Sequence, residues 1–156
     1  LHNGLKALGV LNDKFIPEEY LMASYDQRLA LLQGLMDTDG NASSDRGYCS
    51  ICMVQKGLME QIEFLVRSLG IKVTLTESIA TCTNSKVGYT CPKYSLKWST
   101  SSPMFRLPYK AARQKTAGLR GTQKLHYIKK VEEIESVPVQ CIKVDSPSNL
   151  FLAGKA

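Results

Sequence analysis

The segment from Leu32 to Gly40 constrains this chain more than any other. Its apolar residues recur at helical spacing, and it ends on two aspartates and a glycine. The C-terminus of a helix carries partial negative charge, which favours cations and disfavours carboxylates. Either water solvates Asp37 and Asp39, or a cation lies over this helix end. An EF-hand calcium loop starting at Asp37 would need glycine at position 42 and glutamate at position 48, and Ala42 and Tyr48 exclude it.

A helix from Ser24 to about Asp37 is predicted to lead into this segment. Ser24 followed by Gln27 fits a capping box, and an acid at position 26 suits the positive end of a helix. One stripe of this helix is apolar, and a second has small side chains that let two helices approach closely. The apolar stripe is Leu29, Leu32, Leu35 and Met36, and the small-residue stripe is Ala30, Gly34 and Thr38. Packing within one domain and pairing with another helix are both consistent with the second stripe.

Strands and one amphipathic helix are predicted to follow. Strand alternation places Val73 and Leu75 on one face and Lys72 and Thr74 on the other. The helix has its apolar residues on one face and a glycine stop after it. The predicted order is a short strand near 41–45, a strand 48–54, a helix 56–69, a strand 71–82, a polar loop 83–92 and a strand 94–98. A last helix is predicted to start at Ser102 and Pro103, with Pro108 interrupting it.

The charge of the chain is unevenly distributed. The formal net charge is +6, and no acid occurs between Glu77 and Glu132. The basic residues between them are Lys86, Lys93, Lys97, Arg106, Lys110, Arg113, Lys115, Arg120, Lys124, Lys129 and Lys130. Such a basic block indicates either a polyanionic partner or a solvated basic face.

The cysteines and the apolar runs indicate in which cellular compartment the chain is expected. Five cysteines are an odd number, which argues against a full disulfide framework and suits a reducing cytosol. No apolar run is long enough to span a bilayer, so no membrane partner is expected, and the chain beginning at leucine is expected to be a fragment. The pair Cys49 and Cys52 has zinc-like spacing, which Cys82 and Cys91 could complete. Because i and i+3 on a strand point to opposite faces, buried free thiols are predicted instead.

The segment Leu32–Gly40 resembles the signature of the LAGLIDADG homing endonucleases. The similarity extends upstream through 15–21, Ser24 and 27–32, a longer form similar to the endonuclease domain of an intein. The stretch 137–154 resembles the penultimate block of the intein splicing domain. The resemblance implies an α+β fold: an αββαββα unit with an antiparallel DNA-binding sheet, followed by C-terminal strands of a Hint-type splicing fold. The expected organisation is a lead-in at 1–23, an endonuclease unit at 24–118 and a partial splicing segment at 119–156, with strands at 137–144 and 149–153.

The resemblance also implies the chemistry of the site. Asp39 is expected to be catalytic and, with Gly40, to bind Mg²⁺, while Asp37 is expected to support either the helix end or the residues around the metal. Members of this family place a lysine near the metal-bound water, and Lys97 is the candidate, with Lys93 as the alternative. A divalent cation polarises the phosphate and stabilises the leaving oxygen in phosphodiester hydrolysis.

The polar face of the predicted sheet suits DNA phosphates and base edges. The predicted DNA-binding residues are Arg46, Lys72, Thr74, Lys93, Lys97 and Arg113. The small-residue stripe is expected to pair with a second LAGLIDADG helix, upstream in the parent protein or from a second copy of the chain. In the splicing segment, Cys141 is either a buried core thiol or a nucleophile that attacks the upstream splice junction as a thiolate.

The sequence therefore predicts an intein-encoded homing endonuclease that makes a magnesium-dependent cut in a long duplex site. It is expected to be cytoplasmic, in a bacterium or a phage-infected host, and to need the N-terminal part of the splicing domain before it can splice. Two alternatives remain: a nucleic-acid-binding or maturase-like module without cleavage, and a fragment whose main role is protein splicing.

Overall fold

The computed structural model describes residues 2–7, 9–11, 14–82, 89–121, 125, 127–151 and 153. Its helices are α1 (His2–Ala7), α2 (Glu18–Leu21), α3 (Tyr25–Thr38), α4 (Lys56–Ser68) and α5 (Pro108–Ala111). Its strands are β1 (Asn41–Ala42), β2 (Cys49–Met53), β3 (Val73–Cys82) and β4 (Tyr89–Trp98). From α3 to α5 the order is αββαββα, as predicted.

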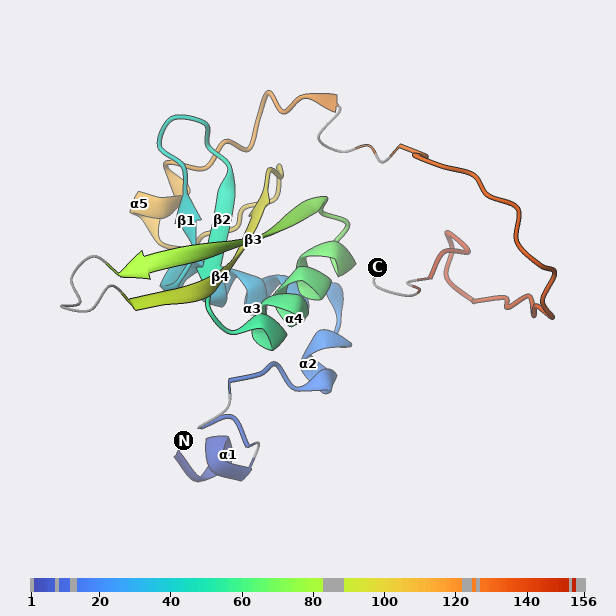
Figure 1. Cartoon of the computed structure of the whole chain (residues 1–156), viewed down its shortest axis with the longest axis horizontal. Coiled ribbons are helices and arrows are strands. Elements are labelled where there is room, and N and C mark those ends of the chain that lie inside the picture. The colour runs from blue at the N-terminus through green and yellow to red at the C-terminus, as the bar shows by residue number, and fades with distance from the viewer. Residues whose placement is uncertain are drawn as a thin grey trace.

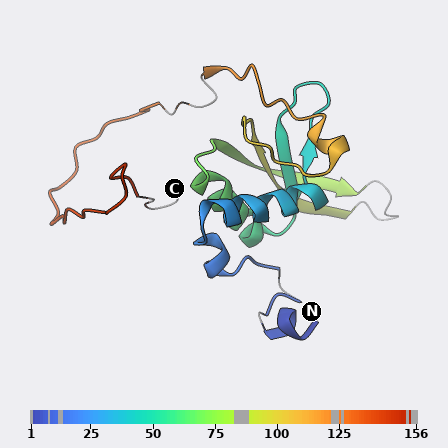
Figure 2. The same ribbon diagram turned by 180° about the vertical axis from the view of Figure 1, so that it is seen from behind.

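The four strands form one antiparallel sheet in the order β1-β2-β4-β3. Helices α3 and α4 cover one face of this sheet (Figures 1 and 2). The predicted α+β class, with an antiparallel sheet packed on helices, is confirmed.

The core lies between α4 and the covered face of the sheet. Helix α4 is amphipathic, and its apolar face is buried against β2, β3 and β4. The buried side chains it contributes are Leu58, Met59, Ile62, Leu65 and Val66, and those of the sheet include Cys49, Ile51, Val73, Leu96 and Trp98. Burying such side chains supplies most of the stability of a domain. The α4 helix ends as predicted, because Gly70 takes a φ of +74° just beyond its last turn.

The first turn of α3 has the predicted capping box. The Ser24 hydroxyl accepts from the Gln27 backbone N–H at 3.4 Å, and the Ser24 backbone N–H donates to Gln27 Oε1 at 3.1 Å. These reciprocal bonds satisfy N–H groups that have no partner inside the helix.

The prediction for the last helix is wrong about its start. The segment after β4 stays irregular, and α5 begins at Pro108. Side chains from elsewhere hold the segment: Gln33 Nε2 donates to the Pro103 carbonyl at 2.8 Å, and Gln114 Oε1 accepts from the Met104 N–H at 2.9 Å. Proline suits the first turn because its missing N–H would have no partner there, so Pro108 starts this helix instead of interrupting it.

Strand β4 also differs, because it begins at Tyr89 and not at residue 94. The hairpin is longer than predicted, since β3 provides partners as far as Thr90, Cys91 and Pro92. Polar composition alone therefore misplaced the start of this strand. The rest of the predicted loop, residues 83–88, lies outside the described residues.

The predicted strands of the C-terminal tail (residues 119–156) are wrong. The described residues from 127 to 151, which include all of 137–144, contain no strand. The tail runs away from the folded body in Figures 1 and 2. A strand needs a hydrogen-bonding neighbour and a surface on which to bury its apolar side chains. Among the described residues no strand pairs with the tail, and Ile128, Val131 and Val139 are each 86% exposed.

None of the described helices has the length and apolar character that crossing a membrane would require.

Candidate functional site

The two aspartates that end α3 have different surroundings. Asp37 Oδ1 accepts from the backbone N–H groups of Arg106 and Leu107, at 3.0 and 3.2 Å. It therefore holds the segment before α5 against the end of α3. Asp39 is the C-cap residue of the helix, its side chain is exposed, and one of its oxygens accepts from the Thr38 hydroxyl at 3.1 Å. Of the two carboxylates, Asp39 has room for a ligand.

A cation does lie over this helix end, and it is the ammonium of Lys110. Its Nζ donates to four backbone carbonyls, those of Met36, Asp37, Thr38 and Gly40, at 3.1, 2.8, 3.3 and 2.7 Å. A cation at this position complements the helix dipole and satisfies carbonyls that have no partner inside the helix. Sequence analysis placed Lys110 only in the basic block, and no local pattern connects it to a helix more than seventy residues earlier.

Gly40 is required by a close approach of the backbone. A Cβ at this position would lie 2.6 Å from three atoms of Met36, two of which belong to its backbone. The chain therefore turns tightly over the last turn of α3, and the Gly40 carbonyl is directed to the same side as the carbonyls that Lys110 gathers.

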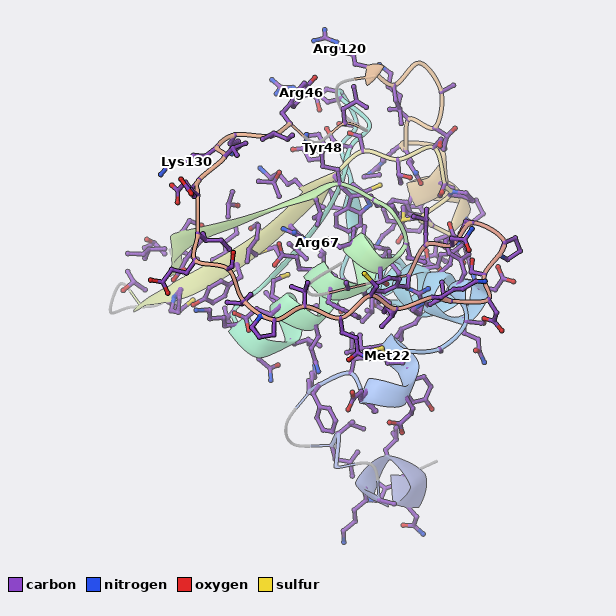
Figure 3. The ribbon with its side chains drawn as sticks, turned by 90° about the vertical axis from the view of Figure 1, so that its right-hand side faces the viewer. Met22, Arg46, Tyr48, Arg67, Arg120 and Lys130 are labelled. Carbon is purple, nitrogen blue, oxygen red and sulfur yellow. The ribbon has the colours of Figure 1, made fainter. Side chains whose placement is uncertain are left out.

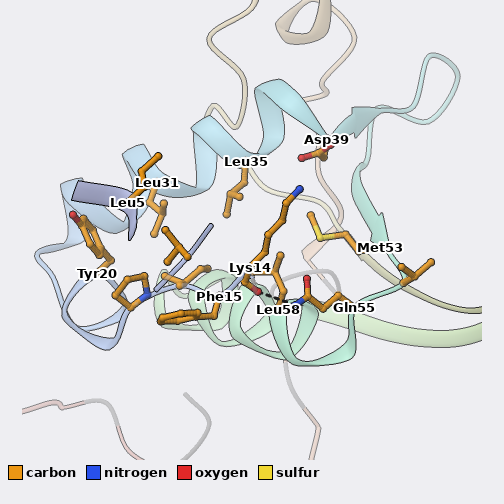
Figure 4. A pocket seen from close by; sticks show the side chains of 14 residues that line it. Leu5, Lys14, Phe15, Tyr20, Leu31, Leu35, Asp39, Met53, Gln55 and Leu58 are labelled. Atoms are coloured by element: carbon orange, nitrogen blue, oxygen red, sulfur yellow. Dashed lines mark hydrogen bonds between the residues drawn. The ribbon is translucent and has the colours of Figure 1, made fainter. Parts of the chain in front are cut away.

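A hollow of about 660 Å³ opens beside Asp39. Its walls come from the lead-in, α3, the end of β2 and the start of α4, and they are mostly apolar (Figure 4). The Lys14 side chain runs between Leu35 and Met53 toward Asp39 (Figure 4). The Lys14 backbone is held in turn, because Gln55 Nε2 donates to its carbonyl at 3.0 Å. Sequence analysis missed Lys14, although it stands directly before the segment 15–21 that carries the family resemblance.

Lys97, the lysine predicted to act with Asp39, lies on the polar face of the sheet. This face is made by Asn41, Ser50, Thr74, Lys93 and Lys97. Lys97 is exposed, pairs with Ser50 and Thr74, and has its Nζ 5.8 Å from the centre of the Tyr48 ring. The hollow beside Asp39 is lined by Lys14 and not by Lys97. That Lys97 acts on the metal-bound water stays a prediction.

The predicted DNA-binding residues share one side of the sheet only in part. Thr74, Lys93 and Lys97 lie on the polar face, while Arg46 occupies the turn between β1 and β2 near Tyr48 (Figure 3). Arg113 is exposed just after α5.

The ammonium of Lys72, another predicted DNA-binding residue, has contacts with the tail. Its Nζ donates to the Leu125 carbonyl at 2.7 Å and lies 5.9 Å from the centre of the Tyr127 ring.

The small-residue stripe of α3 is open. Ala30 is half-buried, whereas Gly34 and Thr38 are exposed, and a Cβ added to Gly34 would meet nothing within 4 Å. Within the described residues, therefore, no second helix is packed on this stripe.

The cysteines whose side chains the structure describes are free thiols. Among the residues described, no group of three or more His, Cys, Asp or Glu side chains could hold a metal ion. Cys49 is buried, and burial raises the pKa of its thiol to about 12. Cys52 is exposed because it points to the opposite face of β2, so the prediction of a buried thiol is right for Cys49 and wrong for Cys52. Cys141 is exposed on the tail of this chain, and its role as a core thiol or a nucleophile stays a prediction.

The residues at the end of α3 fit a hard divalent cation. Asp39 offers an exposed carboxylate, and Gly40, which has no side chain, offers its carbonyl oxygen. Mg²⁺ prefers oxygen ligands, keeps several waters and is typically held by one or two carboxylates together with substrate phosphates. One carboxylate and one carbonyl match that pattern as a partial ligand set.

Comparison with known proteins identifies the class. A family model for the homing endonucleases matches residues 15–115, which is more than half of the chain and contains α3, the sheet and α5. The chain therefore belongs to the homing endonuclease family. It is also similar to the replicative DNA helicase DnaB of Mycobacterium intracellulare, with 34% identity over 154 residues. That match covers 97% of this chain but only 26% of the helicase, so the chain spans about a quarter of that relative's length.

Proposed function

We propose that this chain is a LAGLIDADG-type endonuclease domain that binds duplex DNA and hydrolyses its phosphodiester bonds with Mg²⁺. The observation that carries the proposal is the end of α3. It places an exposed carboxylate, Asp39, beside a hollow that Lys14 also enters, in a chain whose family is that of the homing endonucleases.

Each part of the site has a distinct task in this proposal. Asp39 and the Gly40 carbonyl would hold the cation, which when bound polarises the scissile phosphate and stabilises the leaving oxygen. Lys14 would hydrogen-bond the attacking water, because its side chain extends toward Asp39 along the mostly apolar wall of the hollow (Figure 4). The polar face of the sheet would hold the duplex through phosphate and base-edge contacts.

A second LAGLIDADG helix would complete the site. The open stripe of Ala30, Gly34 and Thr38 supports this, because two backbones can approach closely only where side chains are small. The second helix would come from an upstream repeat or from another copy of the chain. Each helix end would then serve one DNA strand, which accounts for a double-strand cut.

The principal test separates binding from cleavage. A duplex target is first selected from a random DNA library by repeated binding to the complete endonuclease. Asp39→Asn should then bind this duplex as the parent does and show no magnesium-dependent cleavage. The matched control is Asp37→Asn, whose amide oxygen can still accept from Arg106 and Leu107, and which should keep cleavage. Cleavage by Asp39→Asn at the parental rate would refute the proposal.

The two lysine candidates are distinguished in the same assay. Lys14→Met should lower the cleavage rate by roughly 10²-fold, the usual contribution of a positioned proton-transfer group, with little change in DNA affinity. Lys97→Met should lower affinity and leave the rate in the bound complex near that of the parent. If Lys97→Met lowers the cleavage rate and Lys14→Met lowers only the affinity, Lys97 is the lysine that contacts the attacking water.

The polar face is tested through salt dependence. The logarithm of the affinity should fall linearly with the logarithm of the salt concentration, by roughly 0.9 per neutralised phosphate. Reversal of Lys93, Lys97 and Arg113 to glutamate should weaken binding and flatten that slope. An unchanged slope would show that these residues form only a solvated face.

We further propose that the endonuclease is carried by an intein and that the tail is part of its splicing domain. Two observations support this: the resemblance of 137–154 to a splicing block, and a match to a helicase that includes nearly the whole chain, the tail with it. The exposed apolar side chains of the tail would be buried once the rest of the splicing domain is present.

In that precursor Cys141 would be the nucleophile. Its thiolate would attack the carbonyl carbon of the upstream splice junction. The C–N bond of that junction would break as the thioester forms, and its nitrogen would take up a proton from water and leave as an amine. Cys141→Ala should abolish splicing and N-terminal cleavage in the full precursor while Cys52→Ala, a matched exposed cysteine, leaves both intact. Spliced product at the parental rate from Cys141→Ala would refute this role.

The observations favour the enzyme over a module that only binds nucleic acid, because Asp39 is intact and exposed. A binding or maturase-like module remains the alternative if the parental protein binds the selected duplex but does not cut it.

A further inference from the structure

The contact between α3 and α5 is reciprocal. Asp37 on α3 accepts from the backbone before α5, and Lys110 on α5 donates to the carbonyls that end α3. The aromatic ring of Phe105 lies 5.9 Å from Lys110 Nζ and adds a cation–π contact. The half-buried Lys110 ammonium is thus held from several sides at the turn that carries Asp39 and Gly40.

A second basic side chain caps the other long helix, and the difference between the two is informative. Arg28 Nη1 donates to the Ser68 carbonyl at the end of α4 at 2.8 Å, and its Nε donates to the Ala23 carbonyl. Arg28 therefore makes one contact with its helix end, whereas Lys110 makes four and includes Gly40, the residue after Asp39. Capping alone would not require the gathering of carbonyls on both sides of Asp39.

We propose that Lys110 is a positioning residue for the metal-binding turn, and this inference rests on the proposed function above. By drawing the carbonyls of Thr38 and Gly40 to one ammonium, Lys110 fixes the peptide group that precedes Asp39 and the peptide group that follows Gly40. The Gly40 carbonyl has a second lone pair, so it can accept from Lys110 and face a cation at once. Lys110 thereby sets the direction of the Gly40 oxygen and the Asp39 carboxylate without being a ligand itself.

A positioning role and a purely electrostatic role for Lys110 predict opposite changes in metal affinity when its ammonium is removed. An ammonium that merely lies near the site repels a divalent cation, so its removal would tighten metal binding. An ammonium that positions the ligands strengthens metal binding, so its removal weakens it. Residues that orient metal ligands are typically worth roughly 10- to 100-fold in affinity.

The experiment uses the 156-residue chain, labelled with ¹⁵N, and Mn²⁺ alone as a paramagnetic probe. Selective broadening of the amide signals of residues 38–41 is followed during titration to obtain an affinity. Lys110→Met, which keeps the apolar stem, should bind Mn²⁺ at least about tenfold more weakly than the parent. Arg28→Met removes the matched cap of α4 and should lower the unfolding temperature while leaving Mn²⁺ affinity unchanged.

Two further variants make each outcome decisive. Lys110→Arg keeps the charge, but its planar fork cannot converge on four carbonyls, so weaker Mn²⁺ binding is expected on a native fold even if Lys110→Met unfolds. Asp39→Asn should abolish the broadening. The positioning role is overturned if both Lys110 variants bind Mn²⁺ as tightly as the parent or more tightly, while Asp39→Asn does not bind it. That result would leave the proposed function unchanged. Broadening unchanged by Asp39→Asn would instead refute the metal site itself.

Discussion

The two long helices are close in length but are used differently. Helix α4 has 13 residues and buries one continuous apolar face against the sheet. Helix α3 has 14 residues, of which only Leu32 and Met36 are fully buried, while Leu31 and Leu35 are partly buried and line the hollow beside Asp39. The other side of α3 exposes Gly34 and Thr38.

Helix α4 is used for packing alone, whereas α3 both packs on the core and borders the candidate site. A helix with a single apolar stripe needs a single surface to cover it, and the sheet covers α4. A helix with apolar or small residues on several sides needs more than one neighbour. One side of α3 packs on the core, a second borders the hollow, and a third is open to a partner helix.

The largest expected difference between the two helices is the loss of unfolding free energy when a leucine in each is truncated. Leu65→Ala in α4 should lower the free energy of unfolding by about 2–5 kcal/mol, because the side chain is fully buried and a cavity would remain. Leu35→Ala in α3 should cost roughly half as much or less, since this side chain already borders open space. Urea denaturation of both variants measures the difference. Equal losses would mean that the hollow is packed in solution.

The second-largest expected effect is the loss of stability when the capping box at the start of α3 is removed. Ser24→Ala removes the capping box and should cost about 1 kcal/mol. Ser24→Asp, which can still accept from the Gln27 N–H, is the control and should stay near the parent. Urea denaturation again gives the values, and a loss below a few tenths of a kcal/mol would show that α3 is held by packing alone.

The smallest effect concerns the open stripe, and its sign is informative. Gly34→Ala should raise the stability of the chain by up to about 1 kcal/mol, because alanine favours a helix and the added Cβ meets nothing. Gly40→Ala is the control at the same helix end and should be destabilising, since its Cβ would lie 2.6 Å from the Met36 backbone. Gly34→Leu should additionally weaken pairing with a second motif helix, seen as lost cleavage by the complete enzyme. If Gly34→Leu cleaves as the parent does, the stripe is not an interface.

The predictions that the structure confirmed rest on local patterns. The capping box, the amphipathic face of α4, the stop at Gly70 and the alternation of Val73 and Thr74 each depend on residues a few positions apart. The two acids at the end of α3 were also visible in the sequence, but the bonds from the backbone before α5 to Asp37 were not. The prediction of strands in the tail was wrong because it needed a distant contact. Residues 137–144 have a strand-like pattern, but a strand forms only against a neighbouring strand.

Helices α3 and α4, the strands of the sheet and the acidic end of α3 could all be predicted from local sequence, because hydrophobic period and capping act over one or two turns. The residues that surround the end of α3 could not, since they depend on how distant segments pack. Lys110 reaches it from α5, Arg106 and Leu107 bind Asp37 from the preceding segment, and Lys14 enters from the lead-in. These side chains are brought together by the packing of distant segments, and a contact between distant segments leaves no periodic trace in either one.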